Sequence, residues 1–150
     1  MTAAPTSFAS LPLPPATLDN LLRLGYTSMT PIQAASLPLA LAGKDLIAQA
    51  KTGSGKTAAF ALALLANLNP RPKLGNPAVQ SLVLCPTREL AEQVTQEVRR
   101  LARAEDHIKV ITLCGGSTMR PQLASLEHGA HIVVGTPGRI MDHLERGSLK

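Results

Sequence analysis

Short aliphatic runs that alternate with helical patterns constrain the fold of this chain more than any other feature. Four largely apolar runs bounded by turn residues are expected to be strands: residues 45–50, 81–85, 109–114 and 131–135. Continuous apolar runs are typical of strands that are buried on both faces. We therefore predict an α/β fold, a parallel sheet flanked by helices, whose ligands gather at the carboxyl ends of the strands.

The segments around these runs have helical patterns. Between residues 87 and 103, an apolar stripe that includes Leu90, Val94 and Val98 repeats at helical spacing. Three further helices are expected: one that follows Pro14-Pro15 and ends before Gly25, one from Pro31 to Gly43 with Thr30 as its cap, and one over residues 56–66. Strand and helix alternate from residue 45 onward, which is the order expected for a parallel sheet.

Composition limits the classes of function. A chain of 150 residues is one domain's worth, and its two cysteines, Cys85 and Cys114, have no CxxC spacing. We expect buried, structural thiols and a cytoplasmic protein, because no apolar run approaches the roughly 20 residues of a membrane span. The net charge of +5 favours an anionic partner without selecting one. Aromatic residues at 2% are too few for a nucleic-acid stacking platform. The histidines lack metal-ligand spacing.

The sharpest motif is a phosphate-binding loop between the first expected strand and a helix. It comprises Ala50, Lys51, Thr52, Gly53, Ser54, Gly55, Lys56 and Thr57. The glycines let successive N–H groups face one anion, Lys56 supplies charge to the β and γ phosphates, and the Thr57 hydroxyl can bind Mg2+. Lys56 and Thr57 are therefore the candidate catalytic residues. Ala50 departs from the usual glycine, and the loop alone does not distinguish ATP from GTP. The ordinary alternative is a Gly-Ser turn that precedes a lysine.

Residues 25–33, which include Gly25, Tyr26 and Gln33, resemble the Q motif of DEAD-box RNA helicases. The resemblance implies that Gln33 reads adenine, that Tyr26 belongs to the same site, and that Phe8, 17 residues before Gly25, packs on the base. One amide can donate to and accept from adenine at once, which favours ATP over GTP. The ordinary alternative is a helix cap with an exposed glutamine.

The resemblance to DEAD-box helicases continues at the ends of the later strands. Residues 86–91 resemble motif Ia, residues 115–116 the glycine pair, and residues 136–139 motif Ib. In that family these segments line the RNA backbone without reading sequence, which implies RNA contacts by Pro86, Thr87, Arg88, Gly115, Gly116, Thr136, Pro137, Gly138 and Arg139. Arginines suit phosphate oxygens, and glycines admit close approach. Each segment alone is also an ordinary turn or helix start.

The resemblance implies an organisation and an activity. Residues 1–43 are expected to form an N-terminal extension with the Q-motif helices, and residues 44–150 a RecA-like ATP-binding domain that lacks motif II at its C-terminal end. ATP and Mg2+ are the implied cofactors. RNA and a second RecA-like domain are the implied partners, and no membrane is involved. The motif wording is most similar to a bacterial branch that acts on large-subunit ribosomal RNA.

Two other classes of function stay open on the sequence. One is a nucleotide-binding or RNA-binding module without turnover, which suits a chain that lacks motif II. The other is a different phosphate-loop enzyme such as a small kinase, which leaves Gln33, Arg88 and residues 136–139 unexplained. We expect residues 1–150 alone neither to hydrolyse ATP at a helicase-like rate nor to unwind a duplex. We also expect an unpaired edge in the sheet.

Overall fold

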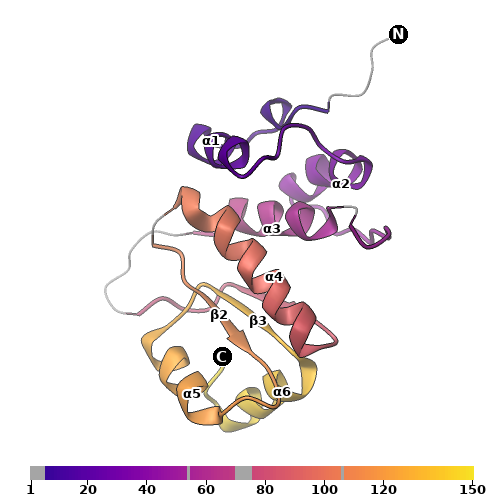
Figure 1. The fold of residues 1–150 in the computed structure, drawn as a ribbon. Coiled ribbons are helices and arrows are strands. Elements are labelled where there is room, and N and C mark those ends of the chain that lie inside the picture. Colours follow the sequence, from indigo (N-terminus) through magenta and orange to yellow (C-terminus); the bar gives the residue numbers. More distant parts are fainter. Residues whose placement is uncertain (1–5, 54, 70–75, 106) are drawn as a thin grey trace. The chain divides into compact units, whose positions relative to one another are not determined.

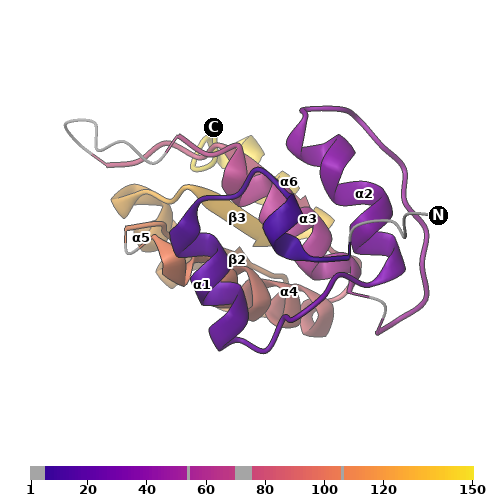
Figure 2. The ribbon, with the colours of Figure 1, turned by 90° about the horizontal axis from the view of Figure 1, so that it is seen from above.

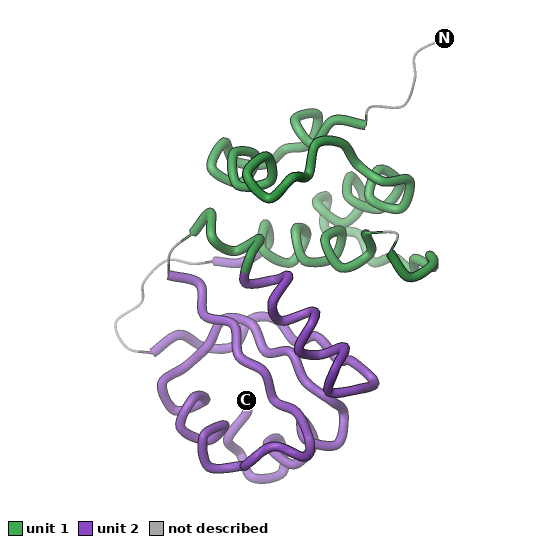
Figure 3. Tube along the Cα trace, viewed as in Figure 1, with its two compact units in different colours: residues 1–67, 100–106 green, residues 68–99, 107–150 purple. Residues whose placement is uncertain are grey.

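The fold is described from a computed structural model, which places residues 6–53, 55–69, 76–105 and 107–150 (Figure 1). The chain divides into two compact units (Figure 3). The first unit comprises residues 1–67 and 100–106, and its described elements are helices. The second comprises residues 68–99 and 107–150 and carries the sheet.

The first unit is helical in its described elements. Helices α1 (Pro15–Arg23), α2 (Pro31–Leu41) and α3 (Lys56–Ala66) lie where the sequence predicts them, whereas the 3₁₀ helices η1 (Phe8–Ser10) and η2 (Ala102–Ala104) were not predicted. Helices α2 and α3 are in contact (Figure 2), and small residues such as Ala58 and Ala61 are buried on α3. Small side chains let two helices approach closely, so this packing brings the start of α2 near the start of α3.

A buried amide holds α1 in the first unit. Asn20 is 4% exposed, and its Nδ2 donates to the carbonyl oxygens of Arg100 and Leu101 at 3.0 and 3.2 Å. Leu101 is the last residue of α4 (Arg88–Leu101), where carbonyls lack partners within the helix. Asn20 therefore satisfies a helix end that lies some 80 residues away in the sequence.

The second unit is built on a three-stranded parallel sheet. Its strands are β1 (Ser81–Leu84), β2 (Val110–Leu113) and β3 (Ile132–Gly135), in the order β1-β3-β2. In register, Leu82 pairs with Val133 and Thr112 with Val134. Helices α5 (Met119–His128) and α6 (Pro137–Arg146) follow β2 and β3. The predicted α/β fold, a parallel sheet flanked by helices, is confirmed.

Helices cover both faces of this sheet. Thr112 Oγ1 donates to Thr95 Oγ1 of α4 at 2.9 Å, so the Thr112 face of β2 is turned toward α4. Successive residues of a strand point to opposite faces. Accordingly, Leu113 and Val133 pack with Ile140 of α6 and with Leu149 in a buried cluster on the other face. The central strand β3 is buried at all four positions.

The strand predicted at residues 45–50 does not form, which corrects the sequence analysis. The segment has no regular secondary structure, and Ile47 is 98% exposed. An apolar run becomes a strand only when a neighbour pairs with its backbone groups. Residues 45–50 belong to the first unit, whose described elements are helices, whereas the sheet lies in the second. Burial on both faces also fails for β1, an edge strand with Leu82 45% and Leu84 55% exposed.

Candidate functional site

The predicted phosphate loop leads into α3 in the first unit. Gly53 and Gly55 have φ of +82° and +87°, a left-handed conformation that favours glycine. Gly55 is the N-cap of α3, and among the described residues no side chain caps this helix. The N–H groups of a helix's first turn are a ready anion site because they lack partners and carry the positive end of the dipole. Ser54 lies outside the described residues.

The charged and hydroxyl groups of the loop lie where α3 begins. Lys56 is exposed, and its Nζ donates to the Ala50 carbonyl oxygen at 2.5 Å, across the loop. Thr57, the next residue of α3, is half-buried, while Lys51 and Thr52 are exposed. Two lysines, two threonines and a helix N-terminus therefore lie within the eight residues 50–57.

Gln33 joins the start of α2 to this loop. Its Oε1 accepts from the Thr30 N–H at 3.0 Å, and its Nε2 donates to the Gly55 carbonyl at 3.1 Å. The side chain is almost fully buried, and a Cβ at position 55 would lie 2.4 Å from Nε2. The resemblance predicts Gln33 in the nucleotide site, but the sequence did not predict this contact. These two bonds use one N–H and one oxygen lone pair of the amide.

The two aromatic residues expected in the nucleotide site lie together. Phe8 and Tyr26 pack edge to face, with ring centroids 6.2 Å apart and an interplanar angle of 89°. Phe8 is 4% exposed, so most of its ring is covered by protein, whereas Tyr26 is half-buried. The structure thus places Phe8 against Tyr26, at the start of the segment that leads to Thr30 and Gln33.

The segments expected to line RNA lie together at the second unit's sheet. Since β1, β2 and β3 are parallel, their carboxyl ends meet at one edge. There the Gly115 N–H donates to Thr136 Oγ1 at 3.0 Å, and a Cβ on Gly116 would lie 3.9 Å from an Arg88 guanidinium nitrogen. Three segments, 86–88, 115–116 and 136–139, thereby form one surface of hydroxyls, backbone amides and cationic side chains.

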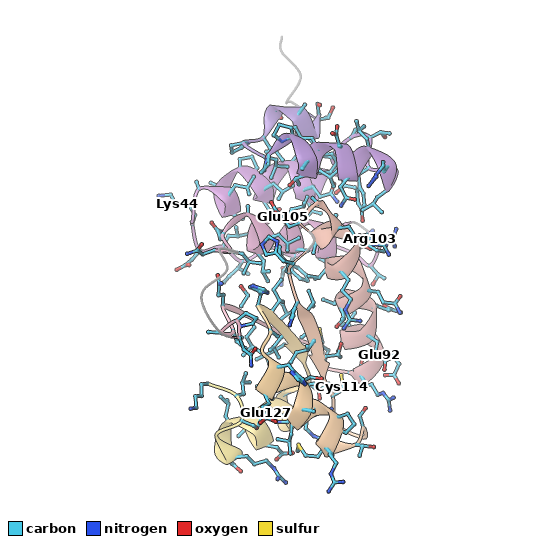
Figure 4. All side chains as sticks on the ribbon, turned by 90° about the vertical axis from the view of Figure 1, so that its left-hand side faces the viewer. Lys44, Glu92, Arg103, Glu105, Cys114 and Glu127 are labelled. Carbon is cyan, nitrogen blue, oxygen red and sulfur yellow. The ribbon has the colours of Figure 1, made fainter. Side chains whose placement is uncertain are left out.

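Arg88 presents an accessible cation on this surface. Its side chain is 50% exposed, and its Nε lies 3.2 Å from a carboxylate oxygen of Glu92, which is 54% exposed (Figure 4 labels Glu92). Exposed ion pairs contribute little free energy, about 0–1 kcal/mol. Thr87 Oγ1 accepts from the Leu90 N–H at 3.2 Å and so caps α4. Pro86, Pro137 and Gly138 are also exposed.

Arg139 has a different environment from Arg88. Its side chain is 14% exposed, and its Nη1 donates to the Ser117 carbonyl at 2.9 Å and to Gln122 Oε1 at 3.2 Å. Its Nε lies 3.7 Å from an Asp142 carboxylate oxygen and has no hydrogen-bond partner among the described residues. The structure therefore turns one of the two expected RNA-contacting arginines inward.

The polar groups around Arg139 are functional candidates that sequence reasoning missed. Gln122 and His143 are buried, and His143 Nε2 lies 2.8 Å from Gln122 Oε1. His143 Nδ1 lies 2.8 Å from Ser148 Oγ. Each of these residues sits on a polar-rich helix or turn, where the sequence pattern does not distinguish a buried polar group from a solvated one. Only the contacts reveal them.

Burial shifts the pKa values of the two thiols and of two histidines in the second unit. It raises the pKa of the Cys85 and Cys114 thiols, with smaller contributions from neighbouring charges, so both stay protonated near neutral pH (Figure 4 labels Cys114). Burial lowers the pKa of His131, and His107 and Lys109 lower it further. Burial likewise lowers the pKa of His143, with Arg139 and Arg146 adding to the effect. Neutral imidazoles are thus favoured in the fold.

The described residues hold neither a cluster of metal ligands nor a helix that could span a membrane. In the parts of the chain that the structure describes, no three His, Cys, Asp or Glu side chains gather as a metal site would require. None of the described helices is both long and apolar enough to cross a membrane.

Comparison with known proteins finds relatives that belong to one family. Residues 30–150 match the sequence profile of the DEAD/DEAH box helicase family. The chain is 56% identical over 145 residues to the Escherichia coli K12 ATP-dependent RNA helicase DbpA, covering 96% of this chain and 31% of that protein. It is 49% identical over 144 residues to the ATP-dependent RNA helicase DeaD of the same strain, covering 96% of this chain and 22% of that protein.

A solved structure agrees with these sequence relatives. The crystal structure of a DEAD box protein from the hyperthermophile Methanococcus jannaschii superposes with a TM-score of 0.87 and 39% identity. It covers 97% of this chain and 38% of that one. The chain thus spans about a third or less of the curated relatives named above.

Proposed function

Because this chain belongs to the DEAD/DEAH box helicase family, we propose that it carries the ATP-binding site and part of the RNA-binding surface of an ATP-dependent RNA helicase. The observation that carries the proposal is the hydrogen bond from Gln33 to the Gly55 carbonyl. It links the residue expected to read adenine directly to the loop expected to hold phosphate. A phosphate loop of another class has no need of such a glutamine.

The nucleotide site has groups that fit ATP with Mg2+. The uncapped start of α3 and the left-handed glycines supply N–H groups for phosphate oxygens. Lys56 adds a full positive charge for the β and γ phosphates, and the Thr57 hydroxyl is the protein's Mg2+ ligand in this proposal. When bound, Mg2+ neutralises charge on the phosphates. The amide of Gln33 selects adenine, with Phe8 and Tyr26 as the apolar wall for the base.

The RNA surface in this proposal is the carboxyl edge of the sheet. Arg88 pairs with a phosphate, and exposed backbone and hydroxyl groups in the segments 86–87, 115–116 and 136–138 contact the sugar-phosphate backbone. Phosphate contacts supply affinity without sequence readout. We expect sequence-independent gripping of a single strand, completed by a second RecA-like domain in the whole helicase.

The finer parts of the proposal rest on likeness to the relatives. We propose residues 1–43 as an extension with the Q-motif helices and 44–150 as the RecA-like ATP-binding domain. The 56% identity to the ATP-dependent RNA helicase DbpA supports RNA as the substrate class. From the resemblance of the motifs, we further propose structured ribosomal RNA as the substrate, ribosome biogenesis as the process and the cytoplasm as the compartment. ATP hydrolysis and RNA unwinding are proposed as activities of the whole helicase.

The proposal is tested by nucleotide titration and by RNA-stimulated phosphate release. Calorimetry with Mg-ADP and Mg-GDP should give tighter binding for ADP, and Lys56→Ala should weaken the binding of both nucleotides. Equal affinity for the two nucleotides would remove the adenine-reading role of Gln33. Phosphate release from ATP, with and without oligo(U), then separates a catalytic chain from a nucleotide-binding or RNA-binding module without turnover.

A further inference from the structure

The arginines at the sheet's carboxyl edge differ in accessibility. Arg88 is 50% exposed and pairs with the exposed Glu92, whereas Arg139 is 14% exposed and donates to Ser117 and Gln122. A phosphate could bind the Nη1 group of Arg139 only by competing with these partners. The inward position of Arg139 therefore favours a role in holding neighbouring protein groups over direct contact with a ligand.

Gln122 is the centre of the contacts around Arg139. Its Nε2 donates to the Cys114 carbonyl at 3.1 Å, which fixes the orientation of the amide. Its Oε1 therefore faces Arg139 Nη1 at 3.2 Å and His143 Nε2 at 2.8 Å, and it accepts from both. This arrangement assigns the proton of His143 to Nε2, with Nδ1 turned to Ser148 Oγ. Gln122 is 7% exposed and His143 is fully buried, and the polar side-chain atoms of both have protein partners.

These hydrogen bonds bracket the glycine pair. Gln122 holds the carbonyl of Cys114 on one side, and Arg139 holds the carbonyl of Ser117 on the other. A third bond, from the Gly115 N–H to Thr136 Oγ1, lies between them. Gly116 has φ of +79°, and glycine backbone loses more conformational freedom on ordering than any other residue. A Gly-Gly loop needs such external anchors to keep a single conformation.

We propose that Arg139 and Gln122 are positioning residues that hold residues 114–117 in the conformation that binds RNA, while Arg88 is the arginine that contacts phosphate. The role in RNA binding rests on the proposed function. The positioning of the loop does not, because it is a property of the chain without RNA. Arg139 then contributes to affinity by ordering the Gly115-Gly116 backbone.

Salt dependence of RNA binding separates a phosphate-contacting arginine from a positioning one. Anisotropy of a labelled oligo(U) is measured with the whole chain over a range of salt concentrations. Arg88→Ala should reduce the slope of log K against log salt by about 0.7, the value for one phosphate contact on a single strand. Arg139→Ala and Gln122→Leu should weaken binding about fivefold, the effect of ordering one backbone residue, with the slope unchanged.

The double variant and two further arginine variants serve as controls. The double variant Gln122→Leu/Arg139→Ala should bind RNA with about the affinity of the weaker-binding single variant. The two losses should not add, because both residues hold the same loop. Arg146→Ala removes the same charge from the exposed end of α6, outside these contacts, and should leave affinity nearly unchanged. Arg139→Lys is a milder change, for use if Arg139→Ala folds poorly. It keeps the positive charge but loses the planar guanidinium, and it should weaken RNA binding with the slope of log K against log salt unchanged.

Hydrogen exchange without RNA tests the positioning directly. The amides of residues 115–117 should exchange at least several-fold faster in Gln122→Leu and Arg139→Ala than in the unmodified chain or Arg146→Ala, while exchange in β3 stays slow. Unchanged exchange in that loop would overturn the proposal, as would a drop in salt slope for Arg139→Ala equal to that for Arg88→Ala. If the unmodified chain bound no RNA, the proposed function would fail while the exchange result still decided the positioning.

Discussion

The phosphate loop, residues 50–57, and the turns that follow the strands of the sheet have similar local sequences but are fixed in place by different contacts. Each follows an apolar run and leads into a helix. The turns after β2 and β3 continue paired strands and are joined by the bond between Gly115 and Thr136. The phosphate loop follows an exposed segment, and two side-chain bonds to its carbonyls, from Gln33 and from Lys56, tie it.

This difference shows that an apolar run does not make a strand by itself. Residues 132–135 form a buried central strand because β1 and β2 pair with both of its edges and helices pack on its faces. Residues 45–50 have a similar local pattern but no place in the sheet. A site that follows paired strands is ordered by the sheet, whereas the phosphate loop depends on a few side-chain contacts.

The largest expected effect compares an isoleucine from each of these runs. Ile132→Ala removes a fully buried side chain from the central strand and should lower the free energy of unfolding by about 2–5 kcal/mol. Ile47→Ala changes a side chain that is 98% exposed, and should change stability by less than about 0.5 kcal/mol. Urea denaturation measures both. A cost at Ile47 similar to that at Ile132 would mean that residues 45–50 are packed in solution.

The next effect concerns nucleotide affinity. Lys56→Ala should weaken Mg-ADP binding by about 1.5–3 kcal/mol, the range for hydrogen bonds to charged groups. Lys44→Ala removes the same charge from an exposed position before the loop and serves as the matched control (Figure 4 labels Lys44). Calorimetry on both variants gives the comparison. Equal losses would indicate a general charge effect, and oligo(U) affinity should be nearly unchanged in each.

A glycine substitution tests the link from Gln33 to the phosphate loop. Gly55→Ala places a Cβ 2.4 Å from Gln33 Nε2 at a φ of +87°, and should destabilise the first unit by about 1–3 kcal/mol. Gly43→Ala imposes similar backbone strain at φ +80° with no atom within 4 Å. The difference between the thermal melts of the two variants gives the destabilisation that the clash with Gln33 causes, because both variants share the backbone strain. A smaller loss at Gly55 than at Gly43 would contradict the observed contact.

The smallest effect is a pH dependence confined to the second unit, which contains all four histidines. Since burial, then Arg139 and Arg146, lower the pKa of His143 from 6.5, the unfolded state binds a proton there before the folded state does. Stability should therefore be flat above about pH 6.5 and fall below it, by at most about 1.4 kcal/mol per pH unit for each such histidine. His131 should act in the same direction.

Urea denaturation between pH 5 and 8 checks this sign. His143→Gln should flatten the fall, while His128→Gln, at an exposed position, should leave it unchanged. Stability that rises as the pH drops from 6.5 would show that the folded state favours the imidazolium instead.

The sequence predicted α1, α2, α3 and α4 well because capping and periodicity are local, whereas α5 was not predicted. Thr30 and Gln33 form the capping box at the start of α2, and α3 runs from Lys56 to Ala66 as expected. The strand at residues 45–50 was wrong because its formation depends on a partner elsewhere in the chain. The candidate residues were identified by motif, but the inward turn of Arg139 depends on Gln122, a buried polar position that no sequence period marks.

The central claim is that adenine nucleotide and RNA use separate residue sets, one in each unit. Amide spectra of the ¹⁵N-labelled chain, titrated with Mg-ADP, Mg-GDP and oligo(U), test it most directly. Mg-ADP should shift the backbone amides of Gly53, Gly55 and Lys56 together with the Gln33 side-chain amide, and Mg-GDP should do so only at higher concentration. Oligo(U) should shift the amides of residues 87–88, 115–117 and 136. Equal responses to ADP and GDP, or ADP shifts that fall on residues 115–117 and spare Gly55, would contradict the account.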